Sequence, residues 1–563
     1  MYETIDEKPE ATILLRPPGS TRPADARPRA GASTAWFVTS TFVLMAIAPS
    51  IDAQSLAPET GELWSKNTPG ISDDGLPGDE LGTAVVACDF DFDGYEDLAI
   101  GSPGDDFLTV LDDSGAVNVL YGSPSGLGAA GNQHLFQNGD SAPEADDRYG
   151  SALAAGYFDS DFYCDLAVGV PGEDLDGDED VGAFEIHYGG PSGLATASTT
   201  FYQQAIPNHG SSPEPFDLFG ATLVAGNFNG DFWTDLAVAA PLENWNTTTN
   251  SGHVIVYHGG AAGLSAHSGW SQARVDLQDG EEPGDEFGDA LAAGDFDGDG
   301  FDDLAVGVPG EEVDGTVAVG AVQVIVGSAT GLTGDFDLFY SQHTPGIFTN
   351  PETGDRWGSA LAAGNFDGDD YVDLAVGTPN ESVGTELDAG AVGILYGSAL
   401  GPLPGSYESF TESELALPGD SEAGDQWGFS LATGDIDGDG FDELLVGAPY
   451  EDYSFINAGS FSVLYGTAVG VSEQRYQRVV QWFTGVEANE QADYFGFALT
   501  LGDFDGNGQD EVAVGAPGED IDCTTGCVGS AEDAGVVIVM GNGALFGDGF
   551  ETGDVSAWST SVP

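Results

Sequence analysis

The chain has 563 residues, and 95 acidic residues against 11 Lys and Arg give a formal net charge of −84. Nucleic acids and anionic membranes repel such a polyanion, so neither is expected as a charge-driven partner. Hydrophobic residues make up 41% of the chain and include 32 Phe, 18 Tyr and 9 Trp, enough for a folded core. The 84 Gly and 29 Pro predict many tight turns between short strands.

Residues 1–53 have the features of a secretory signal peptide with a long polar lead. A polar, basic segment precedes an apolar run from Ala35 to Pro49, and Ile51-Asp52-Ala53 offers a small-residue cleavage site before Gln54. A membrane span needs ~20 apolar residues, which makes an uncleaved signal anchor the weaker alternative. We therefore expect a secreted or cell-surface protein whose mature chain has no membrane span.

An aromatic or leucine residue followed by glycine recurs seven times, with the glycines at positions 82, 150, 220, 288, 358, 428 and 496. Each pair precedes a short apolar run, an Asp-rich loop, a second apolar run, a Gly-rich acidic loop and a third apolar run; an aromatic-rich run completes most units. This pattern predicts four short strands per unit. We expect an all-β fold, a seven-bladed β-propeller over residues 54–541, with an open stack of repeats as the alternative.

The two ends of the repeat region are complementary. After the seventh third-strand run at Val536–Met540 the chain shows no clear fourth strand, whereas Gly61–Asn67, ahead of the first repeat, resembles one. We expect this N-terminal strand to complete the last blade and to remove exposed sheet edges.

The Asp-rich loops predict bound calcium. In the fourth repeat, carboxylates stand at loop positions 1, 3, 5 and 9, with a backbone carbonyl at position 7 and Gly300 at position 6 for a sharp turn. Six to eight oxygen ligands with flexible geometry suit Ca²⁺. The fullest sets are Asp295, Asp297, Asp299, Phe301 and Asp303 in the fourth loop, Asp89, Asp91, Asp93, Tyr95 and Asp97 in the first, and Asp435, Asp437, Asp439, Phe441 and Glu443 in the sixth.

The remaining loops carry fewer of these ligands. The fifth has Asn365, Asp367, Asp369, Tyr371 and Asp373, and the seventh has Asp503, Asp505, Asn507, Gln509 and Glu511. The third has Asn227, Asn229, Asp231, Trp233 and Asp235, and the second keeps only Asp159, Asp161 and Asp165. In both of the last two loops phenylalanine replaces the glycine at position 6.

Two other interpretations of these loops explain the pattern less well. A simple Asp/Gly turn is a poor explanation for loops that recur in phase with three or four acids each. An EF-hand needs a Glu at position 12 and flanking helices, whereas position 12 of the fourth loop is Val306 in a strand-like run. Several structural calcium ions are therefore the expected cofactors.

The repeats resemble FG-GAP repeats, the units of the seven-bladed propeller of integrin α subunits. The resemblance rests on the Phe-Gly pairs, the Asp-x-Asp-x-Asp-Gly loops, the Asp-Leu-Ala-Val-Gly runs and Gly447-Ala448-Pro449, and it spans roughly residues 61–541. It implies calcium on the lower face and ligand-binding loops on the upper face. The acidic composition and export signal are typical of a secreted bacterial protein, and leg domains and a cytoplasmic tail are not found in the sequence.

Other acids and cysteines recur with the repeats. An Asp stands two residues before every aromatic-Gly pair, and we interpret it as a turn cap rather than a binding ring. Cys523 and Cys527 could pair across a three-residue loop, while the sequence leaves open whether Cys88 and Cys164 meet. Residues 542–563 form a C-terminal tail, either packed on the ring or a sorting segment.

No catalytic motif stands out: His-Glu-x-x-His and a phosphate-binding loop are both missing from the sequence. We expect a monomeric binding or cell-adhesion module for a protein or a glycan, not an enzyme. The alternative is an extracellular carbohydrate-active enzyme, a glycosidase or lyase, because paired carboxylates are abundant.

Overall fold

The computed structural model describes residues 61–541 except 73–74, 107–110, 140–141, 176, 203–212, 246, 275, 348–349, 416–420, 453–454, 473, 482–489 and 521–532. All described residues belong to the compact unit Asp52–Pro563. The expected signal peptide, the Cys523–Cys527 pair and the C-terminal tail lie outside the described residues.

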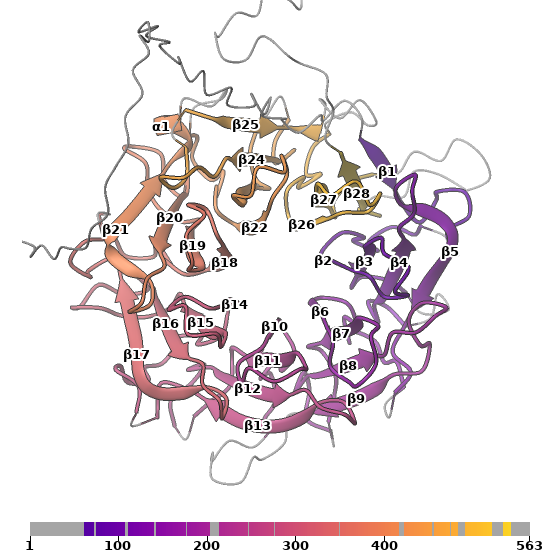
Figure 1. The fold of residues 1–563 in the computed structure, drawn as a ribbon, viewed down its shortest axis with the longest axis horizontal. Helices are drawn as coiled ribbons and strands as arrows, with labels where there is room; N and C mark the ends of the chain where they lie inside the picture. The colour runs from indigo at the N-terminus through magenta and orange to yellow at the C-terminus, as the bar shows by residue number, and fades with distance from the viewer. Residues whose placement is uncertain are drawn as a thin grey trace, which may run out of the picture. The chain divides into compact units, whose positions relative to one another are not determined.

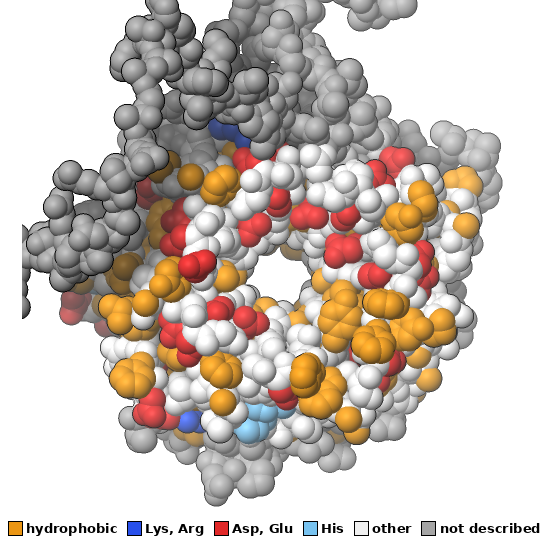
Figure 2. Space-filling model, in the orientation of Figure 1, with side chains coloured by type: hydrophobic (Ala, Val, Ile, Leu, Met, Phe, Trp, Pro, Cys, Tyr) orange, Lys and Arg blue, Asp and Glu red, His pale blue; other side chains and the backbone are white. Residues whose placement is uncertain are grey.

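Seven four-stranded antiparallel sheets stand side by side around a central opening, as Figures 1 and 2 show. The expected all-β, seven-bladed propeller is confirmed. Blades one to three are β2 (Val85–Cys88), β3 (Asp97–Ser102), β4 (Ala116–Tyr121), β5 (Gly128–Leu135); β6 (Leu153–Gly156), β7 (Asp165–Val170), β8 (Ala183–His187), β9 (Thr199–Tyr202); and β10 (Thr222–Gly226), β11 (Asp235–Ala240), β12 (His253–His258), β13 (Ser265–Trp270).

Blades four to six are β14 (Leu291–Gly294), β15 (Asp303–Val308), β16 (Ala321–Val326), β17 (Thr333–Ser341); β18 (Ala360–Gly364), β19 (Asp373–Thr378), β20 (Ala391–Tyr396), β21 (Leu403–Phe410); and β22 (Ser430–Gly434), β23 (Glu443–Ala448), β24 (Ser460–Leu464), β25 (Tyr476–Val479). Blade seven consists of β26 (Leu499–Gly502), β27 (Glu511–Ala516), β28 (Val536–Met540) and β1 (Glu62–Trp64). A short helix, α1 (Glu412–Leu415), follows β21. Within the described chain, no helix is long and apolar enough to cross a membrane.

The N-terminal strand closes the ring as expected. β1 pairs antiparallel with β28, with Glu62 opposite Val539 and Trp64 opposite Val537. The last blade is thereby built from both ends of the described chain, and the outer side of β28 is paired rather than open.

The hydrophobic cores lie between neighbouring blades. The second strand of every blade is buried along its whole length, because a blade packs on each of its faces, and this explains the continuous apolar runs. One cluster joins Leu98 and Ile100 of the first blade to Val537 and Val539 of the seventh, so the closing interface has a core of its own.

The aromatic-Gly pair fastens each blade to the one before it. Phe287 is fully buried, and its backbone pairs with Gly252 of the preceding blade. Gly288 has φ +99°, a left-handed conformation that glycine adopts without strain. Close approach also requires glycine in the second strand: a Cβ on Gly307 would lie 2.2 Å from the carbonyl oxygen of Gly358. The pair therefore recurs for reasons of packing.

Candidate metal sites and the links between them

The Asp-rich loops all lie at one end of the ring, because each joins the first strand of a blade to the second. We call this end the metal-loop face. The loops between second and third strands lie at the other end, which we call the upper face. Strand direction alternates within a blade, so the two sets of loops cannot share a face.

Three of the predicted loops bring carboxylates together. Ligand oxygens lie within 4.8 Å of one another in three sets, one each in the first, fourth and sixth loops. The sets are Asp89, Asp91 and Asp97; Asp295, Asp297 and Asp299; and Asp435, Asp437 and Glu443. These are the loops with the fullest predicted ligand sets.

A shared backbone geometry distinguishes four loops. The position 6 glycines Gly94, Gly300, Gly440 and Gly508 have φ between +86° and +94°, and each donates its N–H to the position 1 carboxylate at 2.9–3.0 Å. Position 5 also donates to that carboxylate, as Asp299 does to Asp295 at 3.0 Å. The chain thus wraps around the position 1 aspartate in the first, fourth, sixth and seventh loops.

The second, third and fifth loops depart from this geometry. Their position 6 residues, Phe162, Phe232 and Asp370, are not in the left-handed region. In the third and fifth loops position 1 is an asparagine whose amide donates to the position 5 carbonyl, as Asn365 does to Asp369 at 2.8 Å. The fifth loop therefore resembles the third in conformation, although it keeps carboxylates at positions 3, 5 and 9.

The position 9 acid has a structural role in every loop. Asp235 of the third loop accepts hydrogen bonds from the N–H groups of Phe228 and Gly259, at 3.1 and 3.0 Å. Asp97 of the first loop makes the equivalent bonds, both at 2.8 Å. Because the acid fastens the loop to the end of the third strand, its presence in the second and third loops does not by itself indicate a metal.

Burial makes these position 9 acids hard to ionise without a cation. It raises the pKa of Asp97 and Asp303 to about 8 and that of Glu443 to about 9, and neighbouring loop carboxylates add to the shift. One oxygen of Glu443, Oε1, is buried and accepts no hydrogen bond. A divalent cation would supply the missing positive charge.

The sixth loop already has a cation beside it. Nη1 of Arg475 lies 2.5 Å from Oδ2 of the buried Asp437, and the guanidinium stacks 3.8 Å above the Tyr465 ring. The first and fourth loops have no such partner among the described ion pairs. Arg475 therefore competes with a metal in the sixth loop.

The loops are linked to one another around the ring. In every blade the position 8 N–H faces the position 1 carbonyl of the preceding loop, at 2.9–3.5 Å; examples are Asp302 to Asn227 and Glu96 to Asp503. Several position 8 side chains add a second link: Asp442 accepts the N–H of Asn365 at 2.7 Å. The position 7 ring then covers the preceding loop, since a Cβ on Gly298 would lie 2.7 Å from Tyr371.

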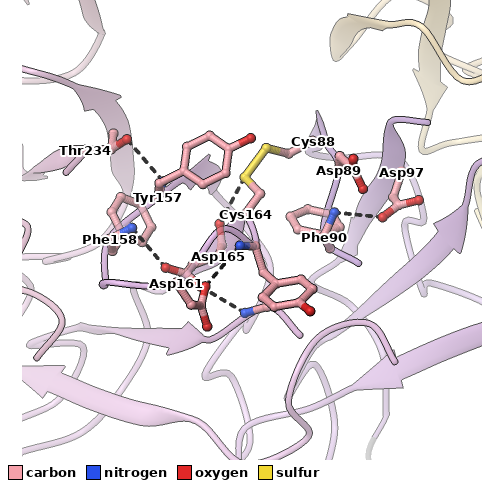
Figure 3. Close-up of a disulfide and its surroundings, with 12 residues drawn as sticks. Cys88, Asp89, Phe90, Asp97, Tyr157, Phe158, Asp161, Cys164, Asp165 and Thr234 are labelled. Carbon is pink, nitrogen blue, oxygen red and sulfur yellow. Dashed lines mark hydrogen bonds between the residues drawn. A yellow bond between two sulfur atoms is a disulfide. The ribbon is translucent and has the colours of Figure 1, made fainter. Parts of the chain in front are cut away.

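At position 8 of the second loop this link is covalent. Cys164 forms a disulfide with Cys88, the residue before the first loop, as Figure 3 shows. The next link is polar, with the Tyr157 N–H donating to Thr234 Oγ1 at 3.1 Å. The structure thus answers the question that the sequence left open, because position 8 approaches the preceding loop in every blade.

The donor sets fit calcium best where carboxylates cluster around a left-handed glycine. Residues of the first and fourth loops would hold the ion through oxygen atoms alone, the chemistry that Ca²⁺ prefers. The seventh loop has the same turn with fewer charges, and the second and third lack both the turn and the position 1 carboxylate.

The recurring Asp on the upper face is a turn cap, as expected. Asp285 accepts the backbone N–H of Glu282, and Asp355 accepts that of Glu352 at 2.6 Å. A second recurring acid, which the sequence analysis did not single out, lies beside this Asp. An acid follows 26 residues later in each repeat, so that Asp285 meets Glu311 and Asp147 meets Glu173 in buried pairs. The constant spacing was the available signal.

These buried acid pairs are held by amides in most blades. Gln272 donates to Glu311 at 2.7 Å and Gln342 donates to Glu381 at 2.9 Å. In the sixth blade Glu412 replaces the glutamine, and the buried Arg478 pairs with both Glu412 and Glu451. A cationic partner at this position compensates for the extra acid.

Comparison with known proteins supports the family resemblance. The FG-GAP repeat model matches residues 81–120, 219–257, 287–324, 357–395, 427–464 and 495–540. The second blade, which carries the incomplete second loop, is not among the matched ranges although it forms a full sheet.

Two kinds of curated relative share the propeller region. Phosphatidylinositol-glycan-specific phospholipase D of Rattus norvegicus is 28% identical over 439 residues, which cover 74% of this chain and 48% of that protein. Integrin alpha-PS2 of Drosophila melanogaster is 32% identical over 243 residues, which cover 42% of this chain and 16% of the integrin. The chain thus spans about half the length of the phospholipases it matches, and less of the integrins.

Among solved structures, rhamnogalacturonan lyase YesW aligns over 81% of this chain and 71% of its own, with a TM-score of 0.38 and 12% identity. Because the phospholipase D relatives are enzymes, the expectation of a non-enzymatic protein stays a prediction. The six matched repeats and the seven blades show that the chain contains FG-GAP repeats, which build an integrin α-like propeller.

Proposed function

We propose that this protein is a secreted, calcium-stabilised propeller that binds a protein or glycan ligand through its upper face, as a recognition or cell-adhesion module. The observation that carries the binding role is an arc of exposed apolar side chains in three adjacent blades. Val317, Leu387 and Ile456 are 53%, 64% and 57% exposed. We call these three residues the upper-face arc.

The arc occupies one structural position. Each member lies three residues before the glycine that opens the third strand, and its carbonyl accepts an N–H from the next blade: Gly354 to Val317, Gly424 to Leu387 and Ala492 to Ile456, at 2.9–3.1 Å. The first three blades have Asp112, Glu179 and Thr249 at this position, with the same hydrogen bonds. The scaffold does not require apolar residues here, so their gathering on one side favours a contact with a ligand.

The calcium role in this proposal is structural. Ions in the first, fourth and seventh loops, and more weakly in the sixth, would neutralise clustered carboxylates and hold loops that are already linked around the ring. The upper-face loops would then be presented by a rigid frame.

The signal peptide expected from the sequence supports an extracellular role. We propose that residues 1–53 direct secretion, that residues 54–541 form the propeller, and that residues 542–563 are a separate tail. The named relatives include integrin subunits, and an acidic surface suits a soluble extracellular protein. A catalytic role is the second candidate, favoured by the phospholipase D relatives.

A binding screen tests the proposal. The purified chain, in excess calcium, would be applied to arrays of matrix proteins and glycans, alongside the V317S/L387S/I456S variant. We expect at least one ligand to be retained by the native chain and lost by this variant. The matched control is L400S/V469S, which removes exposed apolar side chains that are 77% and 88% exposed elsewhere.

Two outcomes would contradict a binding module. One is equal retention of every ligand by the arc variant and the native chain. The other is steady turnover of a polysaccharide or a phospholipid by the purified chain, which would favour the enzymatic candidate.

A further inference from the structure

We propose that the metal-loop face carries a second docking surface, which binds a basic protein segment through its Arg or Lys side chains. The surface consists of Phe92, Phe162, Tyr163, Phe232 and Trp233, from the first three metal loops, and we call it the aromatic patch. It lies at the opposite end of the ring from the upper-face arc, so it goes beyond the function proposed above.

The rings of the aromatic patch project into solvent. Phe232 is 97% exposed, Phe162 74% and Phe92 60%. Figure 2 shows hydrophobic side chains gathered over β6–β7 and β10–β11, beside carboxylates. Phe162 and Phe232 stand at loop position 6, where four other loops have a left-handed glycine. Phenylalanine therefore appears where the metal geometry is absent, and a large exposed apolar group has no stabilising role in the isolated chain.

The patch is held in a fixed arrangement. The Phe92 ring stacks on Phe162 with centroids 6.2 Å apart and meets Tyr163 edge-on at 6.1 Å, and Phe232 meets Trp233 edge-on at 6.5 Å. The Cys88–Cys164 disulfide joins the first loop to the second, and the Tyr157–Thr234 hydrogen bond joins the second to the third. A partner would therefore meet a preorganised surface, which lowers the entropy cost of binding.

The charges around the patch are negative. Asp161 and Asp231 directly precede Phe162 and Phe232, and both are exposed. Both aspartates lie in loops that lack the metal geometry, so calcium is not expected to neutralise them.

The basic residues of the described chain stand elsewhere and pair with other acids. Arg274 pairs with Asp276, Arg356 with Glu286, and Arg475 with Asp437. Lys66 and Arg478 are buried against acids of the upper face, and Arg148 lies near Glu80 and Asp113 there.

Rings flanked by exposed carboxylates complement a guanidinium or ammonium group on an apolar stem. Cation–π contacts and charged hydrogen bonds can then form together. The field of a chain with net charge −84 attracts such a segment and repels a second copy of the chain or an anionic membrane. The segment 542–563 contains Asp548, Glu551 and Asp554 and no Lys or Arg, so the same field disfavours it as the occupant.

Peptide titration tests this surface directly. The full chain in excess calcium would be titrated with a synthetic peptide that alternates Arg and Leu, using calorimetry and tryptophan fluorescence. A peptide that alternates Glu and Leu controls for charge. We expect binding of the first peptide only, and weakening by about tenfold in F92S/F162S/F232S, because about 0.5 kcal/mol is lost for each of three cation–π contacts.

Three variants locate the contact. D161N/D231N should weaken binding and flatten its salt dependence, F232W should retain it, and L400S/V469S should leave it unchanged. V317S/L387S/I456S should also bind the peptide normally, so that failure of the upper-face proposal and failure of this one can be told apart. Unchanged melting of each variant confirms that the fold is kept.

Three results would overturn the proposal. The first is no binding of the Arg-Leu peptide to the native chain. The second is binding of the peptide by F92S/F162S/F232S as tightly as by the native chain, which would assign binding to the general acidity. The third is binding of neutral oligosaccharides or zwitterionic vesicles that requires the three phenylalanines, together with binding of the peptide that does not require them.

Discussion

The third and fourth metal loops occupy the same place in adjacent blades and share the acids at positions 5 and 9, but they differ at positions 1 and 6. Both use the position 9 acid to accept the backbone N–H at the end of the third strand, Asp235 from Gly259 and Asp303 from Gly327. At position 6 the fourth loop has the left-handed Gly300, whereas the third has the exposed Phe232. The blade thus keeps its loop with or without a metal geometry, and counting acids overstates the number of sites.

Among the tests of this comparison, removal of calcium by a chelator should change the stability of the protein most. Removing three or four ions should lower the melting temperature by on the order of 10 °C, since each ion stabilises by about 2.7 kcal/mol at 100 times its dissociation constant. D297N/D299N should reproduce about a third of this drop, and the same changes in the second loop, D159N/D161N, should have no effect. Scanning calorimetry in calcium and in chelator measures both; equal melting with and without calcium contradicts the metal sites.

Exchanging position 6 between the two loops should have the next largest effect. G300F should cost one bound ion and about 4 °C, because phenylalanine is strained at φ +93° and the site is lost with the turn. A Cβ on Gly300 meets no atom within 4 Å, so a steric clash of that atom does not contribute to the loss of stability. The reverse change, N227D/F232G, should leave stability nearly unchanged or add an ion. If G300F keeps all of its calcium, position 6 does not control binding.

Opening the disulfide compares a covalent link between loops with the polar ones. C88S/C164S should cost about 2–4 kcal/mol, or roughly 2–4 °C for a folded chain of this size. The loss should be larger in chelator than in calcium, because the first loop then has neither restraint. T234A, which removes a polar link, should cost less than 1.5 kcal/mol. An equal loss for both variants would show that the covalent link adds nothing.

The pH dependence of the melting temperature should differ between the chelated and the calcium-bound protein. Burial raises the pKa of Asp147 and Asp425 on the upper face to about 7, so the folded chain holds protons that the unfolded chain releases near pH 4. Their stabilising effect is complete below pH 4 and is lost as the pH rises through 7. The chelated protein should therefore melt higher at pH 5.5 than at pH 8. In calcium the loop carboxylates must be ionised, so the difference should shrink or reverse. A fall in melting temperature on acidification in chelator contradicts the assignment.

Much of the fold could be predicted because the repeat stands in phase with the strands. The apolar runs, the aromatic-Gly pairs and the unpaired strand at Gly61–Asn67 determined the blade number and the closure correctly. The aspartates before the aromatic-Gly pairs were also interpreted correctly as caps.

The features that escaped prediction depend on neighbouring blades. Position 8 approaches position 1 of the preceding loop only because the ring brings them together, and the Cys88–Cys164 bond follows from that approach. The pairing of Arg475 with Asp437 of the sixth loop lies within one blade, but the two residues are 38 positions apart in sequence. Loop composition alone does not separate the fifth loop from the seventh, whereas only the seventh has the left-handed glycine at position 6.

The most direct test is the number of calcium ions bound per chain, measured by elemental analysis after dialysis and by calorimetric titration. We predict three ions, in the first, fourth and seventh loops, which have the left-handed glycine and no arginine beside their carboxylates among the described ion pairs. A fourth, weaker ion is expected in the sixth loop, where Arg475 pairs with Asp437. G300F should remove one of them and D159N/D161N none. A native chain that binds one ion or none, or that binds all seven equally, would contradict the account.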